Sequence, residues 1–204
     1  SFNSDNKNLG GTLIVVKNKY KTTHPVHNHV EIFPGRLHYF TMTSDTQGIL
    51  LINYHVDPSM DPDNMILFLN EIIKICEKFP RYRPILPDDL NLDTDLRDRI
   101  NLIGANSCGR VLRAAVHWLQ VSNSANLSEH FQPMPTRFTS ACNVLTNTAS
   151  RNDHIHTNIH DDELSQYSIT THAHGNVFDS SNASDHIPVI TTVKKNPDKN
   201  HDFP

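Results

Sequence analysis

The stretch ILLINYHVDPSMDPDNMILFLNEIIKICEKF, residues 49–79, predicts a buried strand followed by an amphipathic helix. It opens with a nearly continuous apolar run that ends at Val56, as is typical of a strand covered on both faces. Asp61 then supplies an N-cap, and Pro62 takes the first helical position, where its missing N–H costs nothing. Apolar residues recur at helical spacing as far as Phe79, with charged residues between them on the other face.

The segments on either side of this stretch predict further strands and helices. Bounded runs of β-branched and apolar residues predict strands, and apolar periodicity predicts helices. A segment rich in proline and aspartate predicts a loop. The expected elements are strands at 12–16, 30–33, 37–42 and 100–105, a loop from 81 to about 95, and helices at 111–121 and 127–131.

Strands therefore alternate with helices along residues 1–144. Such alternation favours an α/β fold whose parallel or mixed sheet is flanked by helices. In sheets of this kind ligands bind beyond the carboxyl ends of the strands. The first places to look are Asp57 and the segment from Ala105 to Arg110.

The segment 145–204 differs in composition from the rest of the chain. It holds four of the 18 Lys and Arg residues and eight of the 22 Asp and Glu residues, so the whole net charge of −4 lies there. It also holds seven of the 14 histidines, in a chain that is only 37% hydrophobic. We expect an α/β domain at 1–144 and an acidic, His-rich, irregular extended tail at 145–204, which packs along the domain or docks on a partner.

Charge and composition also bear on the partners. A net charge of −4 gives no electrostatic reason to expect nucleic acid, and no apolar run is long enough for a membrane span. Cys76, Cys108 and Cys142 are too few and too scattered for a disulfide framework, so we expect reduced thiols. We expect other protein subunits as partners, in a large complex or on the cytoskeleton, and a cytoplasmic location.

The turn between the strand at 100–105 and the next helix is a candidate anion site. Ser107, Gly109, Arg110 and Arg113 would bring backbone N–H groups, a helix N-terminus and two guanidinium groups together. The thiol of Cys108 would be activated in such a place and could act as a nucleophile. The alternative is a structural turn made by the glycine, with both arginines on a solvated face.

The order of these elements resembles the dual-specificity phosphatase fold. The segments that carry the resemblance are Glu31 to Phe40, Tyr54-His55-Val56-Asp57-Pro58 with the helix after it, and Gly104 to Trp118. They are most similar to the N-terminal domain of the mitotic-exit dual-specificity phosphatases. The resemblance covers about residues 30–135. It implies a phosphatase-like domain that has no catalytic cysteine and that helps to shape the specificity of a catalytic domain.

The turn departs from the active loop of that superfamily, which has His-Cys, five intervening residues and Arg. With Arg113 at the arginine position, Ser107 stands where the cysteine belongs and Asn106 where the histidine belongs. Counting from Cys108 instead leaves the loop one residue short. A serine is a poor replacement for a thiolate, and a shortened loop cannot direct the same ring of N–H groups at a phosphate. The resemblance therefore implies a catalytically silent copy.

Two histidine pairs are candidate metal ligands. His27 and His29 are two residues apart, as are His154 and His156, and on a strand that spacing places both side chains of a pair on one face. Each pair is a workable half-site for zinc or copper. The alternative is a polar, His-rich composition without any metal.

Three functions remain open on the sequence alone. The preferred hypothesis is a non-enzymatic, phosphatase-like structural module, a pseudophosphatase without a cofactor, that docks its tail on partners in a larger assembly. The second is an active dual-specificity-type phosphatase that uses the loop at 106–113, with Cys108, Arg113 and Asp57 as catalytic residues, although Asp57-Pro58 is equally good turn chemistry. The third is a zinc-binding protein that uses the histidine pairs.

Overall fold

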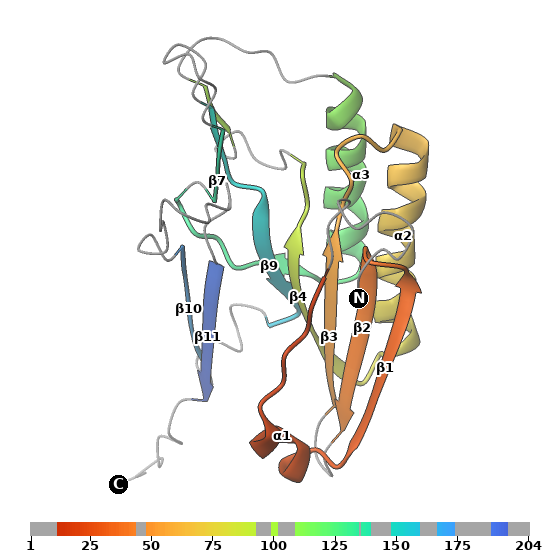
Figure 1. The fold of residues 1–204 in the computed structure, drawn as a ribbon, viewed down its shortest axis with the longest axis vertical. Helices are drawn as coiled ribbons and strands as arrows, with labels where there is room; N and C mark the ends of the chain where they lie inside the picture. Colours follow the sequence, from red (N-terminus) through yellow and green to blue (C-terminus); the bar gives the residue numbers. More distant parts are fainter. Residues whose placement is uncertain are drawn as a thin grey trace, which may run out of the picture.

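Six strands form one mixed sheet, and two long helices lie side by side against one of its faces (Figure 1). The structure is a computed structural model that describes residues 12–43, 48–92, 99–101, 109–134, 136–139, 148–159, 167–173 and 189–195. In chain order its elements are α1 (Asn18–Thr23), β1 (Val26–Phe33), β2 (Leu37–Thr43), β3 (Gly48–His55), α2 (Pro62–Lys78), β4 (Tyr82–Asp89), β5 (Arg99–Asn101), α3 (Gly109–Ser124), β6 (Ser128–Glu129), β7 (Arg137–Thr139), β8 (Thr148–Ser150), β9 (Asp153–Thr157), β10 (Tyr167–Ala173) and β11 (Val189–Lys195).

The strand order of the main sheet is β1-β2-β3-β4-β9-β6. β3 and β4 run parallel because α2 carries the chain back between them, whereas the other neighbours are antiparallel. A three-stranded sheet, β5-β8-β7, and the hairpin β10-β11 complete the strands among the described residues. The expected α/β class, a multi-strand sheet flanked by helices, is thereby confirmed in its coarse form.

The core lies between the sheet and the two helices. Burial alternates along β3, so that Leu50 and Ile52 point at the helices and the residues between them point at the opposite face. Leu69 of α2 and Trp118 of α3 pack against this side of the sheet as part of the same buried cluster. We call the opposite side, away from α2 and α3, the open face of the sheet.

Asp61 caps α2 as the sequence predicts. Its carboxylate accepts hydrogen bonds from the backbone N–H groups of Asp63 and Asn64, each at 3.1 Å. The helix runs from Pro62 to Lys78, in close agreement with the pattern of apolar residues.

The loop expected at 81–95 is wrong, because β4 occupies Tyr82–Asp89. Its two prolines, Pro84 and Pro87, argue against a central strand, since each lacks the N–H that a ladder uses. The pairing with β3 holds from Tyr82 to Ile85, is interrupted at the next two residues and resumes at Asp88. The strand is held between β3 and β9, and Pro84, Leu86 and Asp88 are buried on its helix side.

Three further expectations differ from the structure. Residues 12–17 are extended but belong to neither a helix nor a strand, and the helix expected at 127–131 is replaced by the short strand β6. Part of the expected tail is not a tail, because β9 pairs with β4 inside the main sheet. A boundary at residue 144 would therefore cut through a sheet. Of the described helices, none has the length and apolar character that crossing a membrane requires.

Two leucines of α2 provide a test of this packing. Leu69 is fully buried, whereas Leu67 is 62% exposed on the same helix. We expect Leu69→Ala to lower the free energy of unfolding by about 2–5 kcal/mol, since it removes core contacts and leaves a cavity. Leu67→Ala should change it by less than about 0.5 kcal/mol. Urea denaturation of both variants measures the difference, and equal losses would contradict the placement of α2.

Candidate active site

Three polar side chains form a row across the carboxyl ends of the parallel strands. His55 is paired with Asp89 between β3 and β4, and Asp89 is paired with Asp153 between β4 and β9. Residues that stand opposite each other on neighbouring strands point to the same face. The residues that alternate with them, such as Tyr54 and Asp88, are buried on the helix side. We call His55, Asp89 and Asp153 the open-face row.

His55 and Asp89 are in contact and partly exposed, and Asp153 stands opposite Asp89 on the next strand. Nε2 of His55 lies 3.4 Å from Oδ2 of Asp89, and the two side chains are 25% and 19% exposed. Residues opposite each other in an antiparallel pair, such as Asp89 and Asp153, have Cβ atoms about 5 Å apart. The row therefore places the imidazole of His55 beside the carboxylate of Asp89 at an accessible edge, with a second aspartate opposite Asp89 on the next strand.

Two asparagine side chains connect the end of β4 to the neighbouring strands through hydrogen bonds. Nδ2 of Asn91 donates to the carbonyl of Val56 at 2.9 Å, and Oδ1 of Asn91 accepts from Nδ2 of Asn152 at 2.9 Å. The N–H of Leu90 also donates to the carbonyl of Asn152, at 2.9 Å. Asn91 has a φ of 50°, in the left-handed region that asparagine tolerates better than most residues. These contacts fix the backbone that follows Asp89 to the segments next to it on either side of β4.

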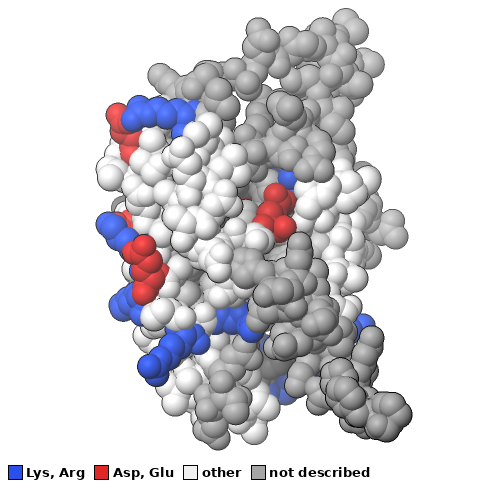
Figure 2. Space-filling model, turned by 180° about the vertical axis from the view of Figure 1, so that it is seen from behind, with Lys and Arg blue, Asp and Glu red and all other residues white. Residues whose placement is uncertain are grey.

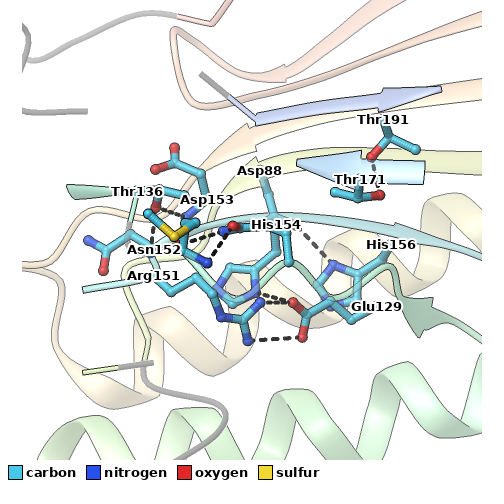
Figure 3. Close-up of polar contacts among 12 residues, drawn as sticks. Asp88, Glu129, Thr136, Arg151, Asn152, Asp153, His154, His156, Thr171 and Thr191 are labelled. Carbon is cyan, nitrogen blue, oxygen red and sulfur yellow. Dashed lines mark hydrogen bonds and ion pairs between the residues drawn. The ribbon is translucent and has the colours of Figure 1, made fainter. Parts of the chain in front are cut away.

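The start of β9 is held by one hydroxyl group (Figure 3). Oγ1 of Thr136 accepts from the backbone N–H of Asn152 at 3.0 Å and from that of Asp153 at 3.1 Å. The N–H of Thr136 in turn donates to the carbonyl of Ser150 at 2.9 Å. The threonine thereby positions the Asp153 end of the row.

A buried polar cluster lies behind the row, on the helix side of β4. The carboxylate of Asp88 has no exposed surface, and its Oδ2 accepts from the hydroxyl of Tyr54 at 2.9 Å. Nδ1 of His156 lies 3.1 Å from the same oxygen. Burial first, and the charge of Asp88 second, raise the pKa of Tyr54 well above its usual value, so this phenol is a hydrogen-bond donor.

A second ionic group ties β6 to β9 (Figure 3). Glu129 pairs with the guanidinium of Arg151, which is 2% exposed, and its Oε1 lies 3.1 Å from Nδ1 of His154. This contact does not have the geometry of a hydrogen bond, and it is an ion pair when His154 is protonated. Burial alone would raise the pKa of Glu129, but Arg151 and His154 outweigh it and lower the pKa to about 2. For His154 burial acts in the opposite direction and on its own would lower the pKa. Glu129 and Asp88 outweigh burial, so the pKa of His154 is raised.

Arg36, in the turn between β1 and β2, reaches the other end of the row. Its NH2 group donates to Oδ2 of Asp57 at 3.0 Å, and its NH1 group donates to Nδ1 of His55. Oδ1 of Asp57 accepts from the hydroxyl of Ser59 at 2.6 Å and from its N–H at 2.8 Å. The hydrogen bonds from Ser59 are the main reason why the pKa of Asp57 is lowered.

Of the residues predicted around the helical turn, only Arg113 has a side chain that the structure describes. Ser107 and Cys108 lie outside the described residues, and for Gly109 and Arg110 the structure describes only the backbone at the start of α3. Arg113 is 65% exposed and pairs with Asp63 of α2 at 3.0 Å, on the helix side of the sheet. Of the predicted catalytic residues whose side chains the structure describes, Asp57 lies near the row, where it holds Arg36.

The four predicted metal ligands do not converge. His27 and His29 are exposed on the edge strand β1, and the latter lies 3.0 Å from Nδ1 of His38. His154 and His156 are buried on the helix side of β9, and β2, β3 and β4 separate the two pairs. Within the part of the chain that the structure describes, no three His, Cys, Asp or Glu side chains are grouped to hold a metal ion.

The sequence did not predict the row, because Asp89, its central member, lies in the segment that was expected to be a loop. The rule that ligands bind beyond the carboxyl ends of parallel strands would have led from Asp57 to Asp89, had β4 been recognised. The run Ile85-Leu86 after a helix was the available signal. No local pattern indicated that Asp153 would stand beside Asp89.

The fold has known counterparts. It is similar to the endonuclease domain of TRAS1, a telomere-specific non-LTR retrotransposon, with a TM-score of 0.58 and 13% identity over 82% of this chain and 69% of that one. It is also similar to the AP endonuclease LMAP from Leishmania major, with a TM-score of 0.60 and 16% identity over 80% of this chain and 56% of that one. The 3′ phosphatase NExo from Neisseria, solved with a product DNA hairpin, has a TM-score of 0.53 and 13% identity over 80% and 65%.

These neighbours share the endonuclease/exonuclease/phosphatase fold. The chain spans less than two thirds of the length of the Leishmania and Neisseria proteins. No protein-family model matches the sequence, and no curated protein matches it either.

The comparisons correct three expectations. The fold is not that of a dual-specificity phosphatase, so the loop at 106–113 was compared with the wrong superfamily. The inference of a silent pseudophosphatase, a structural module that docks a His-rich tail on protein partners, rested on that resemblance and is also wrong. The exclusion of nucleic acid was also wrong, since a protein of this fold was solved with DNA. Net charge by itself does not exclude such a partner, because it averages the whole surface, on which basic and acidic side chains are interspersed along one side (Figure 2).

The ion pair behind the row makes stability depend on pH. The pKa of Glu129 is lower in the folded chain than its ordinary value of 4.5, so its stabilising effect is complete above pH 4.5 and is lost as the pH falls toward 2. We expect Glu129→Gln to cost about 3–5 kcal/mol at pH 7, because it leaves the buried Arg151 without a carboxylate.

The same substitution should flatten the loss of stability between pH 4.5 and 2, which thermal unfolding across that range would measure. Glu71→Gln is the control, since Glu71 pairs with Lys74 on the surface of α2. A Glu129→Gln variant with the stability and acid sensitivity of this control would contradict the ionic role.

Proposed function

We propose that this chain is a hydrolase that cleaves phosphate esters in nucleic acid. The observation that carries the proposal is the open-face row, which places Asp89 and Asp153 side by side at the carboxyl ends of parallel strands. That edge is where sheets of this kind bind their ligands. The row occupies it in a fold that two endonucleases and a 3′ phosphatase also have.

The two carboxylates suit the activation of water. A carboxylate accepts protons, and a water held between Asp89 and Asp153 could lose its proton to one of them as it attacks phosphorus. The P–O bond to the leaving oxygen would break in the same step, and this oxygen would take up a proton from solvent. The frame of Asn91, Asn152 and Thr136 fixes the backbone of both aspartates, so that the attacking water would be held in one place. Precise placement is the main contribution a protein makes to phosphoryl transfer.

Among divalent cations, only a hard ion that prefers oxygen ligands fits the two carboxylates of the row. Oxygen ligands at the row suit a hard ion such as Mg²⁺, which proteins commonly hold through one or two carboxylates together with phosphates of the substrate. Asp89 and Asp153 would hold it. When bound, such an ion supplies charge for the phosphate and lowers the pKa of a bound water. A closed zinc site does not fit, because no three His, Cys, Asp or Glu side chains among the described residues are placed to hold a metal ion.

Substitutions in the row test the proposal. We expect Asp89→Asn and Asp153→Asn each to lower the rate of hydrolysis by about 10²-fold or more, since each removes a proton acceptor and a negative charge. Asp63→Asn is the control, because Asp63 is 75% exposed in the first turn of α2. The assays are nicking of plasmid DNA and release of phosphate from a 3′-phosphorylated oligonucleotide, in the presence of Mg²⁺.

Chelation provides a separate test of the same site. EDTA should abolish both activities, and Mg²⁺ added in excess should restore them in the wild-type chain but not in the two aspartate variants. Activity that survives EDTA, or that the Asp89→Asn and Asp153→Asn variants retain, would contradict the proposal. So would a purified chain that acts on neither substrate.

A further inference from the structure

The contact between Arg36 and His55 determines which nitrogen of His55 carries the proton. A guanidinium has donors only and cannot accept a hydrogen bond. Because NH1 of Arg36 donates to Nδ1 of His55, this nitrogen must offer its lone pair. In a neutral imidazole the proton then resides on Nε2, the nitrogen that lies 3.4 Å from Oδ2 of Asp89.

Arg36 is itself held in place from several directions. Its side chain is 13% exposed and is anchored by Asp57, whose pKa is lowered chiefly by Ser59, so that the carboxylate stays charged. Its carbonyl accepts from the N–H of His55 at 2.9 Å, and its own N–H donates to the carbonyl of Phe33 at 3.0 Å. The turn that presents it contains Gly35 at a φ of 68°, which favours glycine. The guanidinium is therefore a fixed part of the site.

We propose that Arg36 is a positioning residue that holds His55 as its Nε2–H tautomer, so that His55 offers a neutral hydrogen-bond donor to a phosphoryl oxygen beside Asp89. The inference rests on the proposed function, because it identifies how the same row recognises a phosphate ester. A neutral donor suits that place, since it can bind a phosphoryl oxygen without neutralising the carboxylates beside it. Fixed donors of this kind stabilise the charge that develops on oxygen during the reaction.

The alternative is that the ion pair between Arg36 and Asp57 only stabilises the turn between β1 and β2. A structural fastening would stabilise the fold but would be indifferent to the tautomer of His55. The two roles therefore predict different results for the imidazole, and these can be measured without any substrate.

Nitrogen NMR of the full chain at pH 7 provides the first test. Signals of His55 are assigned by their loss in His55→Gln. We expect an unprotonated Nδ1 and a protonated Nε2 in the wild type, and a mixture of the two tautomers in Arg36→Met. Arg81→Met is the control, because Arg81 is exposed in the turn before β4. A protonated Nδ1 in the wild type, or an unchanged spectrum in Arg36→Met, would overturn the inference.

Inorganic phosphate is the probe for the second step. Its addition should shift the Nε2 signal of His55 in the wild type and in Arg81→Met, and should shift it less in Arg36→Met. An Nε2 signal that phosphate does not move in any of these proteins would refute the donor role. These spectra remain decisive where hydrolysis is not found, so a failure of the proposed function is distinguishable from a failure of this inference.

Kinetics on a cleaved substrate supply the last test. We expect His55→Ala to lower kcat by about 10²-fold, as the loss of one donor to a developing charge does. His55→Gln should retain more activity, because an amide N–H can replace Nε2–H and has no tautomer to fix. Arg36→Met should therefore lower kcat strongly in the wild type but only weakly in the His55→Gln background. Equal losses in both backgrounds would show that Arg36 only fastens the turn.

Discussion

The pleat at the end of β4 separates two adjacent carboxylates, and the rest of the site depends on that separation. Asp88 turns to the helix side, where Tyr54 and His156 contact its buried oxygen. Asp89 turns to the open face and meets its partners in the row. Because side chains of a strand alternate with a period of two, a shift of one residue would bury the second and expose the first. The buried contacts of Asp88 thus fix the direction of Asp89.

The parts of the fold that local patterns predict are those that local physics determines. The helix after Asp61 follows from its cap and its apolar spacing, and β3 follows from a continuous apolar run. β4 could not be recognised, because Pro84 and Pro87 oppose a strand locally and only its neighbours on both sides stabilise it. β9 could not be recognised either, because a polar segment that contains two histidines becomes a central strand only through its pairing with β4.

The candidate site shows the same limit more sharply. A row across three strands requires residues from three distant segments, and spacing along the chain carries no information about their register. The dual-specificity interpretation gave weight to a turn before a helix because its ingredients are contiguous in sequence. Order of elements alone did not distinguish that fold from the one found, since strand, helix and strand recur in both. Fold and chemistry must be argued separately, and the chemistry belongs to particular side chains.

The insertion of β9 beside β4 has a consequence for the order of events in folding. His156 and Asp88 are in contact although 68 residues separate them in the chain. Closing so long a loop is entropically unfavourable until the strands on both sides can pair, and contacts of this range form slowly. During synthesis the segments of β3, α2 and β4 are made while β9, which carries the second aspartate of the row, is still absent. The candidate site can consequently be complete only after most of the described polypeptide exists.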